Sequence, residues 1–204
     1  MRIGILGGTF DPVHIAHLVV AEEARIHFSL EEVVFIPAGE PWLKAEQPVS
    51  PAELRLQMVS LAVESNPFFR VSAMEIERPG TTYSVDTLEV LHKEIGPQAE
   101  LYFILGMDAL LDLPRWKEPG RFLEMCVPVA FARPEHSCEV LKELDKRVPG
   151  LKERVQLMDG PAIGISGTEV RRRVAQGISI RYLVPPKVEQ FIAEHGLYRD
   201  AGSR

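Results

Sequence analysis

The strongest constraint on the fold of this chain lies at its beginning, where an apolar run passes directly into a glycine-rich turn. Residues Arg2–Leu6 form a short continuous apolar run, as expected of a strand buried in a parallel sheet. The segment Gly7–His17 (GGTFDPVHIAH) then contains two glycines, a Thr-Phe-Asp-Pro turn and the expected start of a helix near His14. A strand, a tight turn and a helix in this order predict an open α/β sheet, which binds ligands at the carboxyl ends of its strands.

Two histidines follow this turn and share one face of the predicted helix. His14 and His17 lie three residues apart, so both rings are expected to point toward whatever occupies the end of the strand. Free amides at the start of the helix, together with two imidazoles, suit a bound polyphosphate. A glycine-rich turn alone serves many structures, but a pair of histidines directly behind it favours a functional site.

The rest of the sequence alternates between strand and helix patterns. Further strands are predicted at Glu32–Ile36, Phe69–Ser72, Leu101–Leu105, Val127–Ala132 and Val155–Met158. Helices are predicted at His14–His27, after a capping Ser50 and Pro51, at Tyr83–Ile95, near Glu139–Lys146, at Ser166–Ala175 and at Pro186–Glu194. This order predicts an α/β fold with a doubly wound parallel sheet. Because the composition shows no break, residues 1–204 are expected to form a single domain.

Charge, cysteine content and hydropathy narrow the class of protein. The net charge of −6 argues against general nucleic-acid binding, so basic residues must be placed locally where an anion binds. The two cysteines, Cys126 and Cys138, have no metal-type spacing, which suits a reducing cytoplasm. The longest apolar stretch, Leu101–Leu113, is interrupted by Asp108 and Asp112 and is too short to span a bilayer. With no signal-peptide pattern, a cytoplasmic protein that binds neither membrane nor nucleic acid is expected.

A second candidate anion site lies in the segment Ile165–Val174 (ISGTEVRRRV). Ser166 followed by Glu169 is a capping-box pattern, and Arg171 falls within two turns of the positive end of that helix. An anion there would meet amides, hydroxyls and a guanidinium together. A well-capped surface helix is the alternative interpretation. The two arginines after Arg171 project in other directions and are expected to be solvated.

Both segments resemble signatures of the nucleotidyltransferases. GGTFDPVHIAH is similar to their GxFxPxHxGH pattern, with Ala16 at the position where glycine is usual. ISGTEVR is similar to their ISxTxIR pattern, the second half of the triphosphate site in that group. The resemblance implies a Rossmann-like nucleotidyltransferase fold.

Further segments resemble the bacterial nicotinate-nucleotide adenylyltransferases. Pro37–Lys44 (PAGEPWLK) is similar to their PxxxPxHK loop, although Leu43 stands where histidine is common. Arg78–Thr87 and Gly106–Trp116 are similar to their RxGxSYTxDT and GxDxxxxxxxW patterns, and Gly196–Arg199 is similar to the end of that family. The resemblance therefore covers nearly the whole chain.

The resemblance implies transfer of an adenylyl group from ATP to nicotinic acid mononucleotide, giving nicotinic acid adenine dinucleotide and pyrophosphate in NAD biosynthesis. The attacking 5′-phosphate is largely ionised near neutral pH, so no strong general base is needed. Catalysis then consists of holding two anions in line and stabilising their charge. A Mg²⁺ ion held chiefly by the ATP phosphates is implied, and no protein metal site is expected.

The same resemblance implies the roles of individual residues. Those expected to act in catalysis are His14, His17, Lys44 and Arg171. Those expected to bind ATP are Gly7, Gly8, Thr9, Phe10, Gly106, Asp108, Arg133, Ser166 and Thr168. Those expected to bind the mononucleotide are Thr82, Tyr83 and Trp116.

Other interpretations stay open for several residues. Asp108 would accept hydrogen bonds from the ATP ribose, but a helix N-cap has the same pattern. Trp116 would lie against the pyridine ring, whereas tryptophan is more often part of a core. Asp11 is expected to cap or fix the turn before the first helix, without a chemical role.

Two other functions compete with adenylyl transfer to nicotinic acid mononucleotide. Phosphopantetheine adenylyltransferases and cytidylyltransferases share the first signature, but they are usually shorter and lack segments like Thr81–Thr87 and Pro114–Trp116. A nucleotide-binding sensor would keep the fold without turnover, but the candidate catalytic residues argue against it. The oligomeric state does not follow from the sequence.

Overall fold

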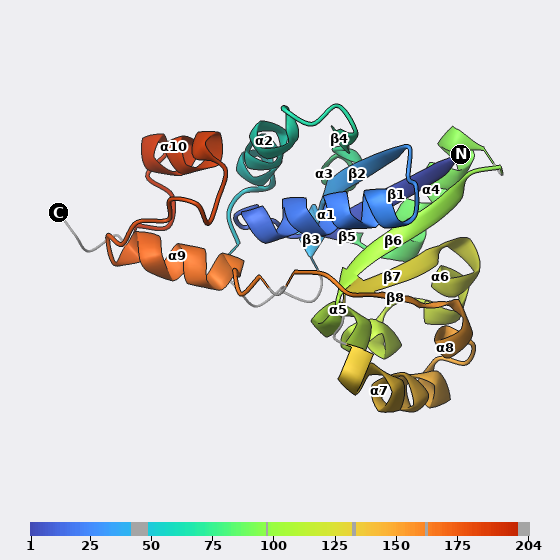
Figure 1. Cartoon of the computed structure of the whole chain (residues 1–204). Helices are drawn as coiled ribbons and strands as arrows, with labels where there is room; N and C mark the ends of the chain where they lie inside the picture. Colours follow the sequence, from blue (N-terminus) through green and yellow to red (C-terminus); the bar gives the residue numbers. More distant parts are fainter. Residues whose placement is uncertain (42–48, 97, 132–133, 162, 200–204) are drawn as a thin grey trace.

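A sheet of six parallel strands forms the centre of the molecule. The computed structural model describes residues 1–41, 49–96, 98–131, 134–161 and 163–199 and gives the strand order β4-β2-β1-β6-β7-β8 (Figure 1). The strands are β1 Arg2–Gly8, β2 Glu32–Pro37, β4 Phe69–Val71, β6 Glu100–Gly106, β7 Val127–Phe131 and β8 Gln156–Met158. The chain builds outward from β1 to β4 and then outward from β6 to β8, so the order reverses between β1 and β6. The predicted doubly wound α/β fold is confirmed.

Alternate residues of the central strands face opposite sides of the sheet and enter two separate cores. Ile3 and Ile5 of β1 are fully buried on one side. Leu6, on the same strand, is buried on the other side. Because both faces are covered, these strands have continuous apolar sequences rather than alternating ones.

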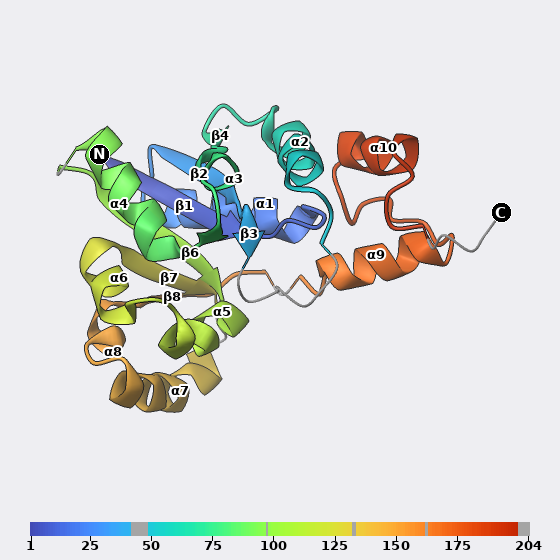
Figure 2. The ribbon, with the colours of Figure 1, turned by 180° about the vertical axis from the view of Figure 1, so that it is seen from behind.

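Helices cover both faces, with α1 in front of the sheet in Figure 1 and α4 in front of it in Figure 2. One core includes residues of α1 Ile15–His27, α2 Ala52–Val63, α9 Gly167–Ala175 and α10 Pro186–Glu194. The other includes residues of α4 Ser84–Ile95, α5 Met107–Asp112, α6 Pro119–Met125, α7 Pro134–Arg147 and α8 Leu151–Arg154. Within the described ranges, no helix combines the length and the apolar composition that crossing a bilayer requires.

The long elements match the predicted ones closely, but short elements were not predicted. These are the helices α3 Met74–Glu77, α5, α6 and α8, the 3₁₀ turn Leu113–Arg115 and the paired two-residue strands β3 Glu40–Pro41 and β5 Thr81–Thr82. Helices of one or two turns contain too few residues for a helical period to be visible in the sequence.

The predicted helix cap at Ser50 is wrong. Pro51 is the N-cap of α2, and its carbonyl accepts from the amides of Leu54 and Arg55. Ser50 is engaged elsewhere, because its amide donates to Oδ2 of Asp11 and its carbonyl accepts from Nε of Arg55. Ser50 therefore joins the loop before α2 to the turn that follows β1.

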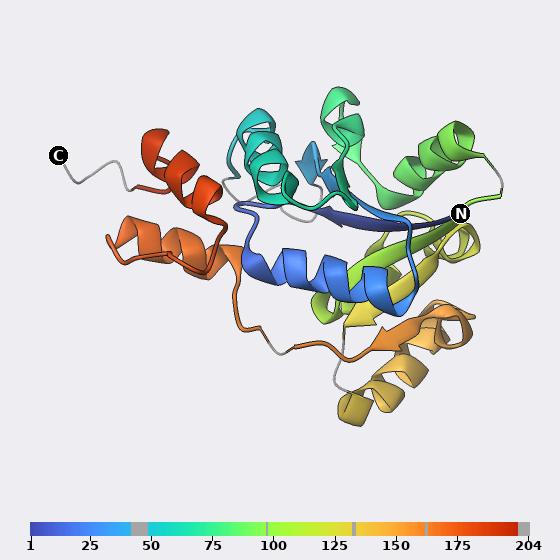
Figure 3. The same cartoon turned by 45° about the horizontal axis from the view of Figure 1, so that its top comes forward.

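The C-terminal helices α9 and α10 lie beside the amino-terminal end of α1, away from strands β7 and β8 (Figures 1 and 3). α10 packs against α2. The amide of Ile15, the first residue of α1, donates to the carbonyl of Leu183 at 2.9 Å. This arrangement brings α9 to the carboxyl end of β1, where the predicted site lies.

Candidate active site

The candidate site lies where the order of the strands reverses, at the carboxyl ends of β1 and β6. Gly7 and Gly8 end β1, and Gly106 ends β6 and is the N-cap of α5. α1 and α5 leave these two ends toward opposite faces of the sheet. In doubly wound sheets, this divergence opens the crevice in which nucleotides bind.

The residues that follow Gly8 support the site from below. The side chain of Phe10 is buried and its ring meets the His17 ring edge-on, with the centroids 4.9 Å apart. The carbonyl of Thr9 accepts from Nη1 of Arg55 at 2.8 Å. Phe10 therefore fixes the turn through its buried ring, and Thr9 fixes it through the hydrogen bond of its carbonyl with the buried Arg55.

The two histidines pack ring against ring at the start of α1. His14 is the N-cap residue, one position before the helix, so the prediction that both histidines lie on its first turn is wrong for His14. Its backbone is extended, with φ −140°, and the two ring centroids lie 3.7 Å apart. The amide of His14 donates to Nδ1 of His17 at 3.1 Å. A nitrogen that accepts this bond carries no proton, so neutral His17 has its N–H at Nε2.

His14 differs from His17 in its environment. Burial lowers the pKa of His14 to about 4, and only 7% of the residue is exposed. Its buried Nδ1 has no hydrogen-bond partner among the described residues. At neutral pH the His14 ring is therefore an uncharged hydrogen-bonding group rather than a cation.

Arg171 connects the two predicted phosphate-binding segments. Its Nη1 donates to the backbone carbonyl of Asp11 at 2.6 Å, and its Nη2 donates to Oγ1 of Thr168 at 3.4 Å. A Cβ at Gly167 would lie 2.9 Å from the Asp11 carbonyl oxygen, so α9 can approach this turn only with glycine at that position. Segments 160 residues apart in sequence thus meet at one point.

The predicted capping box of α9 is half correct. Oγ of Ser166 accepts from the amide of Glu169 at 3.2 Å, as a capping residue does. The Glu169 carboxylate instead forms ion pairs with Arg172 and Arg173, which accounts for its pKa being lowered to about 2. These two arginines share the Glu169 carboxylate on the outer face of α9, whereas Arg171 contacts the turn after β1.

Asp11 and Arg55 hold this region together. Asp11 fixes the turn before α1, as expected, but the N-cap of that helix is His14. The Asp11 carboxylate accepts from the Ser50 amide and from the Tyr198 hydroxyl, at 3.2 and 2.6 Å. Arg55 is 1% exposed and donates to the carbonyls of Thr9, Gly39 and Ser50.

Arg55 therefore joins Gly39 and Ser50 to the turn after β1. Burial lowers the pKa of this guanidinium, while the charge of Asp11 opposes the effect. One signal in the sequence marks Arg55, because it lies three, four and seven residues before the buried Met58, Val59 and Ala62 and so interrupts an apolar helix face.

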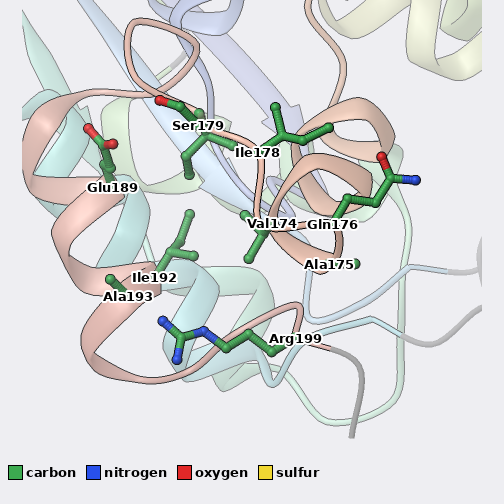
Figure 4. A pocket seen from close by; sticks show the side chains of 11 residues that line it. Val174, Ala175, Gln176, Ile178, Ser179, Glu189, Ile192, Ala193 and Arg199 are labelled. Atoms are coloured by element: carbon green, nitrogen blue, oxygen red, sulfur yellow. The ribbon is translucent and has the colours of Figure 1, made fainter. Parts of the chain in front are cut away.

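Two of the hollows lined by described residues lie near α9. The first, of about 560 Å³, lies beside Arg171 and is lined by Asp11, Val49, Ser50, Thr168, Arg171, Arg172, Ala175, Tyr198 and Arg199. The second, of about 750 Å³, lies between α9 and α10 and is lined by apolar residues such as Val174, Ile178 and Ile192 (Figure 4). Although it is larger, the second hollow contains none of the predicted site residues, and the first is the one adjacent to the candidate site.

The predicted mononucleotide-binding turn combines an exposed Thr81, a half-buried Tyr83 and a buried Thr82. Thr82 of β5 is buried, and its Oγ1 donates to the carbonyl of Glu40. Tyr83 is the N-cap of α4. Beneath the turn, the buried Glu75 carboxylate accepts from Oγ1 of Thr87 at 2.6 Å. Burial raises the pKa of Glu75, and the hydroxyls of Thr87 and Thr82 oppose the shift.

Asp108 and Trp116 follow β6. Asp108 is exposed within the first turn of α5, and because Gly106 is the N-cap, the alternative of Asp108 as the cap is wrong. Trp116 is half-buried, and its ring meets the rings of Phe103 and Phe122 edge-on. Its buried Nε1 has no partner among the described residues. Trp116 thus belongs partly to the core, and one edge of its ring is polar and unpaired within those residues.

The remaining predicted positions are Lys44 and Arg133. Both lie outside the described residues. Their roles stay predictions.

Comparison with known proteins first defines the class. Residues 5–173 match the cytidylyltransferase-like family, so the chain is a nucleotidyltransferase of this group. A solved structure titled as Plasmodium falciparum nicotinic acid mononucleotide adenylyltransferase complexed with NaAD has the same fold, with a TM-score of 0.77, 20% identity and 97% of each chain covered.

Closer relatives then define the family. A "Probable nicotinate-nucleotide adenylyltransferase" of Roseiflexus sp. (strain RS-1) is 49% identical over 197 residues, which cover 97% of this chain and 98% of the relative. The relative of the same name from Moorella thermoacetica is 45% identical over 199 residues, covering 97% and 92%. The chain belongs to the nicotinate-nucleotide adenylyltransferase family. The competing assignments to phosphopantetheine or cytidylyl transfer and to a sensor are not supported.

Proposed function

We propose that this enzyme transfers the adenylyl group of ATP to nicotinic acid mononucleotide, giving nicotinic acid adenine dinucleotide and pyrophosphate. The observation that carries the proposal is the contact of Arg171 with the Asp11 carbonyl. The contact holds the Arg171 guanidinium against the turn that joins β1 to α1, and it supports a shared site in which a triphosphate meets Arg171 and the histidines. The names of the relatives agree with this reaction.

In the proposed reaction, a phosphate oxygen of the mononucleotide attacks the α-phosphorus of ATP. The new P–O bond forms as the bond to the bridging oxygen breaks, and pyrophosphate leaves with that electron pair. Nε2–H of His17 and the neutral ring of His14 donate to the α-phosphate, while Arg171 and Thr168 offset the charge of the leaving pyrophosphate. Lys44 offsets charge on the approaching phosphates. No side chain has to remove a proton from the attacking phosphate.

A Mg²⁺ ion held by the ATP phosphates is also part of the proposal. Among the described residues, no group of three or more His, Cys, Asp or Glu side chains is arranged to hold a metal ion. Both carboxylate oxygens of Asp11 are already engaged by Ser50 and Tyr198. We therefore propose that the oxygens of the substrate hold the ion. When bound, it would neutralise part of the phosphate charge.

The mononucleotide is recognised at the start of α4. The amides of this helix start, after the turn at Thr82, bind the nicotinate carboxylate, because a helix N-terminus attracts an anion. Trp116 contacts the pyridine ring, and the exposed Asp108 accepts from the ribose hydroxyls of ATP.

A cytoplasmic location suits the chemistry of Cys126. This thiol is free and buried in the core, and burial raises its pKa. A reducing compartment is compatible with such a thiol.

The test is release of pyrophosphate from ATP and Mg²⁺ with a panel of acceptors. Nicotinic acid mononucleotide, nicotinamide mononucleotide, phosphopantetheine and phosphocholine are compared at equal concentration, each against an ATP-only control. We expect the nicotinic acid mononucleotide reaction to be fastest and to yield its dinucleotide. A higher kcat/KM for phosphopantetheine or phosphocholine would overturn the proposal.

A further inference from the structure

Tyr198, near the C-terminal end of the described chain, contacts the turn that follows β1. Its hydroxyl donates to Oδ1 of Asp11 at 2.6 Å. Its backbone has φ 61°, a left-handed conformation that a bulky residue adopts only where the surrounding structure imposes it. The short segment that begins at Gly196, just after α10, is therefore held against the turn that follows β1.

Asp11 transmits this contact to both sides of the candidate site. The residue is 7% exposed, and its second carboxylate oxygen accepts from the Ser50 amide at 3.2 Å. Its backbone carbonyl accepts from Nη1 of Arg171 at 2.6 Å. The side chain and the carbonyl of one residue thus join three separate segments of the chain.

The hydroxyl of Tyr198 is a permanent donor in this arrangement. Burial and the hydrogen bond to Asp11 raise the pKa of Tyr198 well above its usual range. The phenol therefore keeps its proton throughout the pH range in which the enzyme is assayed, and the Asp11 carboxylate keeps this partner.

The backbone of α9 lies close to the Asp11 carbonyl. The Asp11 carbonyl oxygen would lie only 2.9 Å from a Cβ at Gly167, and Arg171, Asp11 and Tyr198 all line the 560 Å³ hollow. A rotation of the Asp11 backbone would change the acceptor that orients Arg171.

We propose that Tyr198 is a positioning residue that acts through Asp11 on Arg171. The Tyr198 hydroxyl fixes the Asp11 side chain, the fixed turn presents the Asp11 carbonyl, and that carbonyl orients the guanidinium toward the phosphates. The role of Arg171 in this inference rests on the proposed function. The C-terminal segment Gly196–Arg199 would thus serve the triphosphate site through Asp11.

The first test compares Tyr198→Phe with Tyr182→Phe. Tyr182 is a matched control, because its backbone also has a positive φ, 67°, but it is 84% exposed. We expect Tyr198→Phe to lower kcat/KM for ATP about tenfold while the KM for nicotinic acid mononucleotide changes less than twofold. Tyr182→Phe should match the wild type. Equal kinetics for all three proteins, measured below their melting temperatures, would overturn the proposal.

The second test measures binding of pyrophosphate alone by calorimetry. It does not depend on the identity of the acceptor, so it separates this proposal from the proposed function. A wild type that binds pyrophosphate but does not use nicotinic acid mononucleotide would overturn the proposed function only. We expect Tyr198→Phe to bind pyrophosphate about tenfold more weakly than the wild type and Tyr182→Phe. Unchanged binding, or an equal loss of affinity for the mononucleotide, would show a role other than positioning Arg171.

Discussion

The imidazole rings of His14 and His17 stack with their centroids 3.7 Å apart and their planes 22° from parallel. The pair is unequal, because burial lowers the pKa of His14 to about 4, while His17 accepts the His14 amide through Nδ1. The pair therefore provides hydrogen-bond donors, and a fixed positive charge has to come from another residue. In the proposed reaction Arg171 supplies this charge from a distant part of the sequence, where its guanidinium donates to the Asp11 carbonyl.

His17→Ala should lower kcat at least about a hundredfold, as expected when a positioned donor to the transition state is removed. The same change removes the acceptor of the His14 amide, which costs about 1 kcal/mol of stability, as the loss of a helix cap does. Most of the free energy of unfolding remains. Steady-state kinetics and urea unfolding measure the two effects. Near-normal turnover would assign the histidine a structural role.

The control for this prediction is His27→Ala at the exposed end of the same helix. It removes an imidazole from α1 without touching the candidate site. We expect turnover close to that of the wild type.

His14 should make stability depend on pH between about pH 6.5 and pH 4. Its pKa is lowered on folding, so in this interval the unfolded chain binds more protons than the folded one, and stability falls as the pH falls. Between pH 8 and pH 5 the contribution is about 2 kcal/mol. Urea unfolding of the wild type and of His14→Gln at both pH values isolates it. Parallel pH dependence of the two proteins would contradict the buried, neutral state of His14.

Replacement of Arg171 should reduce activity far more than replacement of Arg173, although the two residues are only two positions apart. Arg171→Ala should raise the KM for ATP and lower kcat, reducing kcat/KM by roughly ten- to a hundredfold, as loss of hydrogen bonds to a charged group does. Arg173→Ala serves as the matched control, because that guanidinium pairs with Glu169 and the Ser179 carbonyl. Equal kinetic losses would point to a diffuse basic face instead of a triphosphate site.

Replacing the buried Arg55 should cost far more stability than replacing an exposed arginine. Arg55→Lys leaves at least two of the carbonyls of Thr9, Gly39 and Ser50 without a donor, which costs roughly 2–5 kcal/mol. Arg70→Lys is the control, since its ion pair with Glu32 is on the surface and contributes little. Chemical unfolding measures both. A loss below about 1 kcal/mol for Arg55→Lys would mean that water replaces the missing donor.

The sequence predicts those parts of the fold and site that depend on local patterns. The alternation of apolar strands and helices is sufficient for the doubly wound fold, and the positions of His17 and Arg171 follow from the two signatures. The sequence does not predict the contacts of Asp11, Arg55 and Tyr198. Asp11 accepts from a backbone amide and Arg55 donates to backbone carbonyls, while Tyr198 reaches this network through Asp11. Almost every residue has a backbone amide and carbonyl, so the residue type does not show which of them a distant side chain will contact.

The predicted start of α2 is wrong for a related reason. Ser50 has the residue type of a cap, but Asp11 and Arg55 engage its amide and carbonyl across the fold. Tertiary contacts override the local preference, and Pro51 becomes the N-cap.

The enzyme should prefer nicotinic acid mononucleotide to nicotinamide mononucleotide. Thr81–Thr87 contains no Lys or Arg, and in the proposed function the backbone amides at the start of α4 recognise the carboxylate. Hydrogen bonds to a charged group contribute about 1.5–3 kcal/mol, which corresponds to a preference of roughly ten- to a hundredfold. The carboxamide of nicotinamide mononucleotide would also place its own N–H groups against the backbone N–H groups of the helix start. The kcat/KM values for the two mononucleotides under identical conditions measure this preference.

Two variants separate the backbone of this turn from its side chains. Gly80 has φ 83°, and a Cβ at this position would have no described atom within 4 Å, so Gly80→Val meets no steric obstacle there but strains the backbone of the turn. We expect it to reduce the preference for the acid. Thr82→Ala removes a hydroxyl that donates to the Glu40 carbonyl inside the protein, so it should cost about 1 kcal/mol of stability and leave the preference unchanged. If Thr82→Ala abolished the preference while Gly80→Val retained it, the carboxylate would be recognised by a side chain and not by the amides at the start of α4.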